Sequence, residues 1–142
     1  MILIISDMSK QSMKKFFMFF AASVMLLSCQ ESMEERAARE AREVTETKCP
    51  MPVADNLYLD SVVFDIPTLT QSQYFRVTGE LDNDSLFEAT DSRSLLLNEL
   101  KNAPTYRTLM KHGVNFRYIY HSTKSPSKVM LELTLTPEDY RQ

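Results

Sequence analysis

Side chains that could catalyse a reaction or bind a metal are few in this chain of 142 residues. Apart from Cys29, which lies in a segment treated below, they include one cysteine, Cys49, and two histidines, His112 and His121. Zinc sites of the Cys₄ or Cys₂His₂ type are therefore excluded within a single chain. A three-ligand site formed by both histidines and Glu132 can be imagined, but the spacing between the histidines matches no ligand motif. We expect one histidine at a helix end and the other on a strand surface.

Other catalytic and ligand-binding patterns are also missing from the sequence. Cys49 has no neighbouring base that could activate its thiol, so we expect it to be buried or to pair with another molecule. Gly79 and Gly113 are the only glycines, too few for phosphate-binding loops. The net charge of −3 argues against nucleic-acid binding. An acidic run lacks the glycine and the final glutamate of a calcium loop and indicates a solvated turn: Asp82, Asp84, Glu88 and Asp91. The sequence therefore predicts no metal, no cofactor and no enzymatic activity.

The amino-terminal region has the layout of a secretory signal peptide. Two lysines precede an apolar run at residues 16–27, and a small residue, Ser28, follows it. A helix of this length spans about 18 Å, against a bilayer core of about 30 Å, so it is too short for a permanent membrane span. We therefore expect residues 1–28 to be removed. Because Met13 directly precedes the lysines, we expect translation to start there.

The residues Leu26, Leu27, Ser28 and Cys29 resemble the lipobox of bacterial lipoproteins. That resemblance implies cleavage between Ser28 and Cys29, a diacylglycerol on the Cys29 sulfur and acylation of the new amino terminus. Two or more acyl chains anchor a protein stably to a membrane. In enterobacterial lipoproteins, an aspartate directly after the lipid-bearing cysteine favours retention in the inner membrane. Because the residue at this position is Gln30, the resemblance favours the outer membrane. The resemblance therefore implies a cell-envelope protein whose membrane contact is a lipid anchor.

Residues 29–48 are strongly charged. They are rich in helix formers and place Glu35, Arg39 and Glu43 at the spacing of helical ion pairs. Their apolar stripe consists mostly of small side chains, which offer little area for docking onto a core. We expect a spacer, helical or partly disordered, that holds the domain away from the membrane. Its first glutamates also resemble the acidic surface-export signals of Bacteroidetes lipoproteins: Glu31, Glu34 and Glu35.

The folded domain is expected to begin at Cys49, because two prolines that follow it end any helix. β-Branched and aromatic residues predict a strand over residues 57–66. A second strand is predicted over residues 74–81, with Phe75, Val77 and Leu81 on one face and polar residues on the other. This alternation is typical of a sheet with one solvated face.

A broken helix is predicted next. Asp91 or Ser92 can cap its start, Pro104 interrupts it, and Gly113 ends it because glycine readily adopts a positive φ. Its apolar side is formed by Leu96, Leu97 and Leu100. Residues 115–121 and 129–135 then alternate strictly, which predicts an antiparallel hairpin, and a short helical turn follows at the carboxyl end.

The order strand, strand, helix, strand, strand predicts an α+β domain over residues 49–142. We expect a small antiparallel sheet with the broken helix packed on one face. The aromatic side chains of Phe116, Tyr118 and Tyr120 share one face of a strand. They form either an interaction face for a ligand or partner, or a face of the sheet that the helix covers.

Two classes of function remain open. The first is a lipid-anchored, non-enzymatic binding or structural module for an envelope protein, peptide or glycan. The alternative is a small ligand-binding or hydrolase-like pocket between sheet and helix that uses His121 with Tyr118 or Glu132. The segments at Cys49, at residues 111–120 and at residues 137–139 resemble small Bacteroidetes lipoproteins. That resemblance implies no particular activity.

Overall fold

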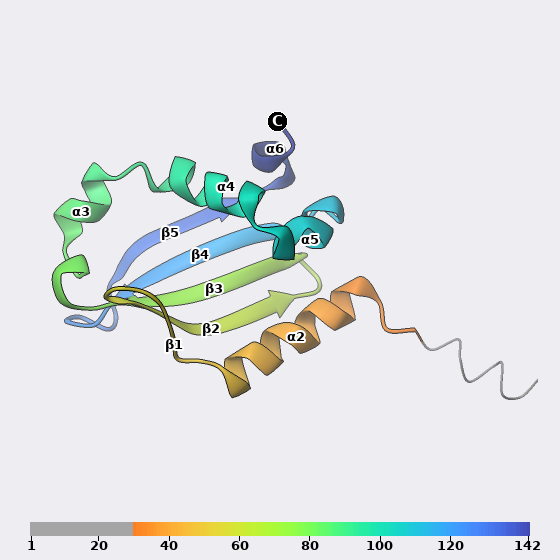
Figure 1. Ribbon diagram of the computed structural model, residues 1–142, viewed down its shortest axis with the longest axis horizontal. Helices are drawn as coiled ribbons and strands as arrows, with labels where there is room; N and C mark the ends of the chain where they lie inside the picture. The colour runs from red at the N-terminus through yellow and green to blue at the C-terminus, as the bar shows by residue number, and fades with distance from the viewer. Residues whose placement is uncertain (1–29) are drawn as a thin grey trace, which may run out of the picture. The chain divides into compact units, whose positions relative to one another are not determined.

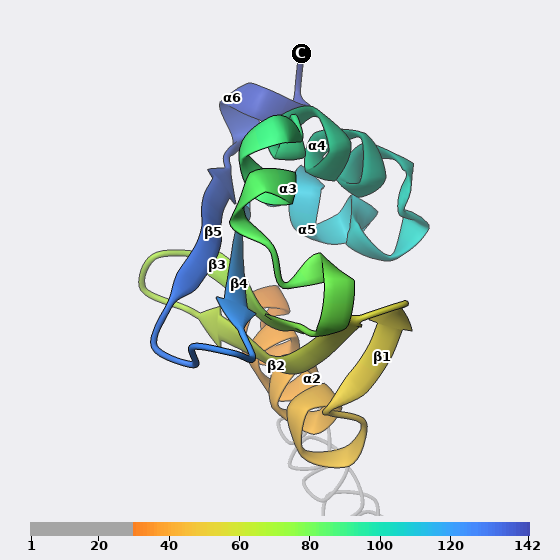
Figure 2. The same ribbon diagram turned by 90° about the vertical axis from the view of Figure 1, so that its left-hand side faces the viewer.

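The computed structural model describes residues 30–142. The predicted signal peptide, with Met13, Ser28 and Cys29, lies outside the described residues. Met33–Gln142 form one compact unit, a five-stranded sheet with helices packed against it (Figures 1 and 2). No helix within residues 30–142 combines the length and the apolar content needed to cross a bilayer.

The α+β class is confirmed, but the sheet is mixed rather than antiparallel. Its strands follow the order of the chain: β1 (Met51–Ala54), β2 (Leu57–Asp65), β3 (Thr70–Val77), β4 (Asn115–Ser122) and β5 (Val129–Leu135). Neighbouring strands are antiparallel except β3 and β4, which run parallel with Thr70 opposite Asn115. The helical connection carries the chain back to the end of the sheet where β3 began. A strand that starts there must run parallel to β3.

This connection is helical and has five pieces, of which the last three lie within the broken helix predicted from the sequence and the first two were not predicted. The five pieces are η2 (Gly79–Leu81), α3 (Asp84–Ala89), α4 (Ser92–Asn102), η3 (Pro104–Tyr106) and α5 (Arg107–Lys111). The Asp91 carboxylate caps α4 by accepting a hydrogen bond from the Ser94 N–H at 3.2 Å. Gly113 follows α5 with φ of +76°, as expected for a helix stop.

Two of the four predicted strands, β3 and β5, differ from the prediction, and β1 was not predicted. β3 begins at Thr70, before the predicted start, and ends at Val77, so that Leu81 belongs to η2. In β5 a bulge interrupts the alternation between Val129 and Leu131. Val129 pairs with His121, whereas Leu131 pairs with the preceding residue of β4. Strict alternation across β5 was therefore wrong, because a bulge adds one residue to one strand.

The largest correction concerns the predicted spacer. Its residues form α2 (Met33–Thr47), which belongs to the folded unit and packs along β2, with Ala37 and Ala41 buried. The Thr45 hydroxyl accepts a hydrogen bond from the Val62 N–H at 2.8 Å, and its own proton lies between the Val62 carbonyl at 2.9 Å and the Ala41 carbonyl of its own helix at 3.0 Å. β1 pairs only with the first part of β2, so Thr45 occupies an edge that would otherwise be open. Small side chains allow this close approach rather than preventing docking.

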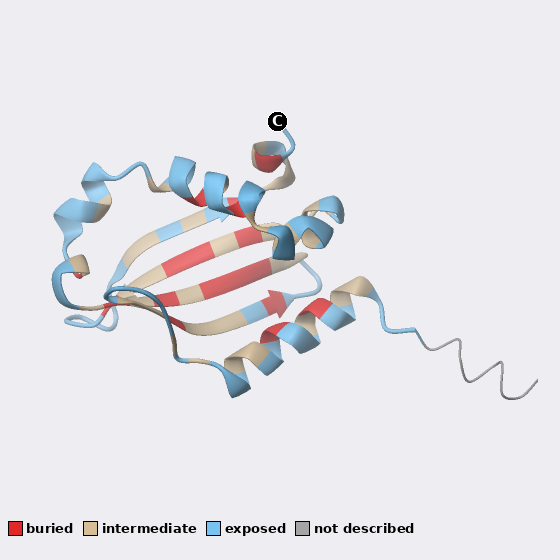
Figure 3. Ribbon diagram, viewed as in Figure 1, coloured by how far each residue is buried: buried red, intermediate tan, exposed pale blue. Residues whose placement is uncertain are grey.

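The core lies between one face of the sheet, here called the inner face, and the helices. Buried side chains from α2, α4 and the inner face of β2 to β5 form one apolar cluster. Figure 3 shows the buried positions on the central strands and on the sides of α2 and α4 that face the sheet. The largest fully buried side chains are Phe116, Leu100, Leu135, Val77 and Val114. The final helix, α6 (Pro137–Tyr140), closes one end of this core, because the Tyr140 hydroxyl donates to the Val114 carbonyl at 2.8 Å.

Candidate binding groove

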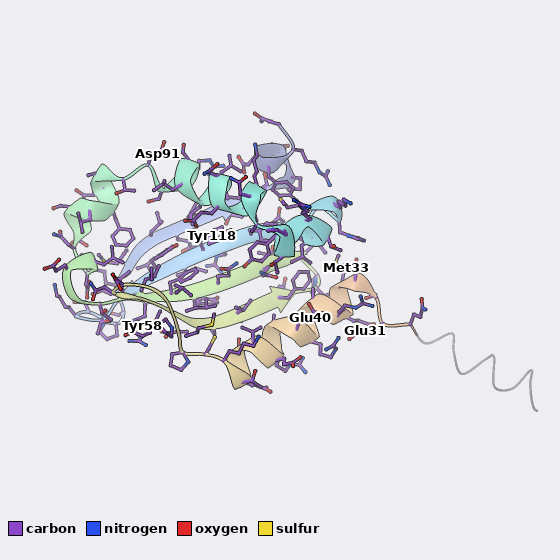
Figure 4. All side chains as sticks on the ribbon, viewed as in Figure 1. Glu31, Met33, Glu40, Tyr58, Asp91 and Tyr118 are labelled. Carbon is purple, nitrogen blue, oxygen red and sulfur yellow. The ribbon has the colours of Figure 1, made fainter. Side chains whose placement is uncertain are left out.

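A groove of about 620 Å³ runs over the inner face between α2 and α5. One wall is the buried side of α2, and the other is formed by η3 and α5. Figure 4 shows Met33 at the start of α2 and Glu40 further along the same helix. The apolar lining consists of Met33, Ala37, Ala41, Val44, Met51, Leu59, Val62 and Leu109. Its size is within the usual range for ligand sites, which is about 300–1,000 Å³.

Two glutamine side chains from β3, Gln71 and Gln73, lie in the floor of this groove. Both are more than nine-tenths buried, with 8% and 6% of their surface exposed. Gln73 donates a hydrogen bond from Nε2 to the Tyr106 hydroxyl at 3.2 Å. The side-chain amide of Gln71 makes no hydrogen bond to any residue of the described chain. The groove therefore combines apolar walls with one amide that has no protein partner.

The sequence analysis did not identify these glutamines or Thr45. Gln71 and Gln73 belong to a polar run, Thr70–Gln73, whose low hydrophobicity hides that it starts a strand. The signal that could have identified them is their period. Gln71 and Gln73 continue the alternation of Phe75 and Val77 toward the amino end, and residues two apart in a strand share a face.

The aromatic row on β4 belongs to the core and not to an exposed interaction face. Phe116 and Tyr118 are buried, and Tyr120 is half-buried. Tyr106 and Tyr140 meet Phe116 edge-on, and Tyr120 stacks on an inner-face phenylalanine of β3. Figure 4 shows Tyr118 in the space between the strands and α4. Of the two interpretations that the sequence left open, these residues therefore fit the second, a sheet face covered by helices.

Burial also determines the ionisation of these tyrosines. It raises the pKa of Tyr120 to about 12, with a smaller contribution from Glu99. It raises the pKa of Tyr118 still further, with smaller contributions from two neighbouring tyrosines and Glu99. Removal of a phenolic proton would place a negative charge in an apolar environment. Both hydroxyls therefore stay protonated at neutral pH, which does not favour a role as a general base.

The residues of the predicted hydrolase-like pocket do not meet. Tyr118 lies on the inner face, whereas His121 and Glu132 lie on the opposite, outer face. Glu132 accepts hydrogen bonds from Arg117, and the His121 ring stacks with Tyr74 at 6.4 Å between centroids. A cavity between sheet and helices exists, as that hypothesis requires. None of its three named residues lines the groove.

The two histidines also lie apart. His112 follows α5, with Nδ1 2.8 Å from the Thr108 carbonyl oxygen, and it lines the groove. His121 lies near the other end of β4, about 20 Å along the strand at roughly 3.3 Å per residue. Its Nδ1 is buried and has no hydrogen-bond partner among residues 30–142. Residues 30–142 hold no group of three acidic, histidine or cysteine side chains placed to bind a metal.

Asp82 is a structural residue that the sequence analysis assigned to a solvated turn. Its carboxylate is buried and accepts hydrogen bonds from the Lys124 N–H at 2.9 Å and from the Thr123 N–H and the Ser122 hydroxyl at 3.0 Å each. These bonds, that of Lys124 above all, hold the pKa of Asp82 below its ordinary value. Asp82 thereby fixes the loop between β4 and β5 to η2.

Cys49 is a free thiol in the described chain, half-buried between α2 and β1. Burial, and secondarily the charge of Asp60, raise its pKa above the ordinary value. The thiol form therefore predominates at neutral pH, which argues against a role as a nucleophile.

Three solved structures share this fold. A Pseudomonas aeruginosa protein described as secreted aligns with a TM-score of 0.60 and 14% identity, over 79% of this chain and all of its own. The pilotin EpsS of the Vibrio vulnificus type 2 secretion system aligns with a TM-score of 0.55 and 12% identity, over 77% of this chain and 92% of its own. The type II secretion system pilotin AspS of Vibrio cholerae aligns with a TM-score of 0.53 and 16% identity, over 75% of this chain and 90% of its own.

Identities of this size show a shared fold. No curated protein matches the chain. A family match extends over residues 32–131. It begins one residue before α2 and includes β1 to β4 and the first part of β5. The chain thus belongs to the family described as Domain of unknown function (DUF8479).

Proposed function

We propose that this protein is a non-enzymatic envelope module that binds an apolar helical segment of a partner protein in the groove between α2 and α5. The observation that carries the proposal is the groove itself. It is about 620 Å³ in volume, has a mostly apolar lining, and lies between two helices over β2 and β3. An amphipathic helix recognises such a groove with side chains on one of its faces.

The bonding of the groove walls favours a helix over an extended peptide. An extended segment needs free backbone groups at a sheet edge to satisfy its own N–H and C=O groups. Val62 lines the groove at the edge of β2. Its N–H and C=O groups already have a hydrogen-bond partner in the Thr45 hydroxyl. A helix satisfies its backbone internally and needs only side-chain contacts.

The structural neighbours support a partner from an envelope assembly. Two of them are pilotins of type II secretion systems, and they share the arrangement of sheet and helices with this chain. We propose that the partner here is likewise a protein component of such an assembly. The fold alone does not fix its identity, because one scaffold serves unrelated functions.

Photo-crosslinking in cells tests this function. A photoreactive phenylalanine analogue at Thr105, an exposed residue on the groove rim, is expected to crosslink one protein, to be identified by mass spectrometry. Thr108→Trp, which narrows the groove from the same rim, should abolish the crosslink. Thr134→Trp, on the exposed outer face of β5, is the matched control and should not. A crosslink that survives Thr108→Trp would contradict binding in the groove.

Attachment through a lipid on Cys29 is a separate proposal, supported by the lipobox resemblance. Only Gln30–Ser32 stand between Cys29 and α2, so the folded unit would begin within about 14 Å of chain from the lipid. Labelled palmitate is expected to enter the full chain and not the Cys29→Ser variant. The Cys49→Ser variant is the matched control and should be labelled normally. Label that persists in Cys29→Ser, or membrane fractionation that this variant does not change, would contradict the anchor.

A further inference from the structure

We propose that Gln71 makes the groove selective for a helix that carries one amide or hydroxyl side chain within its apolar face. This inference rests on the proposed function, since it concerns what the groove accepts. It commits to an occupant of defined chemistry, an amphipathic helix of a partner protein with a single polar residue directed at the floor.

The state of the Gln71 amide is the first reason. Gln71 and Gln73 stand two residues apart on the same face of β3, and both line the floor. Gln73 is bound to the Tyr106 hydroxyl, whereas Gln71 has no side-chain partner in the described chain. Although only 8% of its surface is exposed, the polar atoms of its amide keep part of that exposed surface. Water in the open groove can therefore reach the amide.

The consequence of filling the groove is the second reason. An occupant that is apolar along its whole face would remove that water and leave a buried donor and acceptor without partners, which is unfavourable. An amide or hydroxyl on the occupant restores the hydrogen bonds. A helical backbone cannot do so, because its N–H and C=O groups are already bonded along the helix. The matching group must therefore be a side chain.

A single polar contact in an apolar interface acts mainly on specificity. An asparagine within the apolar seam of a coiled coil fixes register and partner in this way, and it lowers affinity for fully apolar competitors. Gln71 lies near the start of β3, opposite Phe64 of β2 and close to the end of the groove that contains Met33 and His112. The polar residue of the helix should thus lie toward one end of the bound segment.

Selection from a displayed library of amphipathic helices tests the inference. The chain Gln30–Gln142, which contains the whole compact unit with its own core, serves as bait. The helices carry leucine and alanine on one face, with one position of that face randomised in each. The unmodified bait should enrich asparagine, glutamine, serine or threonine at one position. The selected helix should bind about tenfold more tightly than its leucine counterpart.

The Gln71→Leu bait should reverse this preference and enrich leucine at the same position. It is expected to fold normally, because the substitution removes no hydrogen bond within the described protein, and thermal unfolding checks this. Gln142→Leu, which changes an exposed amide at the carboxyl terminus, is the matched control and should select as the unmodified bait does.

Identical selection by the unmodified and Gln71→Leu baits would overturn the role of Gln71 while leaving groove binding intact. The Thr108→Trp variant of the bait shows whether the proposed function itself fails. If no selected helix loses binding on Thr108→Trp, the helices do not use the groove, and both proposals are wrong.

Discussion

Asp82 and Gln71 illustrate two ways in which a polar side chain can be buried in this protein. The Asp82 carboxylate is surrounded by donors from the loop between β4 and β5, so its burial organises the fold. The Gln71 amide lacks a partner among the described residues and lies in the groove floor, so its burial is completed only by an occupant. A polar group on the floor of an open groove, unlike Asp82, can thus bond a group from outside the protein.

Asp82→Asn should destabilise the protein at neutral pH, with an effect that decreases in acid. The folded state lowers the pKa of Asp82, so its contribution is fully present above the unfolded pKa of about 3.9 and is lost as pH falls through the lower folded value. Urea unfolding of both proteins at pH 7 and pH 3 measures the difference. Other carboxylates with lowered pKa values, Asp91 and Asp139, act equally in both proteins and cancel in the comparison. A difference that is the same at both pH values would contradict this role.

Tyr140→Phe should lower the free energy of unfolding by about 1 kcal/mol. The change removes the hydroxyl that bonds the buried Val114 carbonyl at 2.8 Å while keeping the ring, which meets Phe116 edge-on. Chemical denaturation measures the loss. Tyr58→Phe is a suitable control, since no hydrogen bond of the Tyr58 hydroxyl is found in the described chain and its ring lies under Arg76 at the outer face. An equal loss in both variants would mean that the Val114 bond contributes nothing specific.

At the scale of elements, α2 shows how a helix can be predicted correctly and its packing missed. The sequence indicated helix formation over these residues, and the structure contains a helix from Met33 to Thr47. The helix docks because Ala37, Ala41 and Thr45 lie against β2, whose edge is open at Val62. The sequence of the helix alone does not show that edge. A stripe of small residues is weak as a source of buried area but suits a close contact between a helix and a sheet edge.

Thr45→Val should destabilise the protein by about 1–3 kcal/mol, because it leaves the Val62 N–H and C=O without their partner while keeping the size of the side chain. Denaturant unfolding measures the effect. Thr47→Val is the matched control, since the Thr47 hydroxyl bonds only within its own helix, to the Glu43 carbonyl, and is exposed. Equal effects of the two substitutions would contradict the role of Thr45 at the sheet edge.

At the scale of the whole molecule, α2 and the connection between β3 and β4 together create the groove. The connection between β3 and β4 crosses back over the inner face, so that β4 runs parallel to β3 and η3 and α5 form one wall of the groove. The helix α2 forms the opposite wall. Each wall comes from a different part of the chain. The groove exists only when both are folded onto the sheet, so the integrity of α2 is a condition for binding.

Limited trypsin digestion tests whether α2 belongs to the folded unit. A solvated spacer would be cut readily at its arginines, Arg36, Arg39 and Arg42, whereas a docked helix resists cleavage because a protease needs locally unfolded backbone. We expect fragments that retain α2. Ala41→Glu, which places a charge at a buried contact, should make these sites cleavable, and Arg42→Glu in the exposed part of the helix should not free the remaining two. Rapid cleavage at Arg36 and Arg39 of the unmodified chain would contradict docking.

The sequence by itself determined the local elements. β-Branched and aromatic residues identified β2, and period-two alternation identified β4 and β5. The cap at Asp91, the break at Pro104 and the stop at Gly113 identified the second part of the helical connection. All these signals depend on neighbours within a few residues. The signal peptide and the lipid on Cys29 remain predictions from the sequence, because residues 1–29 lie outside the described residues.

Only the tertiary structure decided which surfaces meet. Parallel pairing of β3 with β4, docking of α2 on Val62 and the separation of His121 from Tyr118 depend on contacts between residues distant in the chain. The polar start of β3 was missed for the same reason, since Gln71 and Gln73 are buried by helices from both sides of the sequence. Local patterns report what a segment can become, whereas burial of a side chain depends on the elements that pack against it.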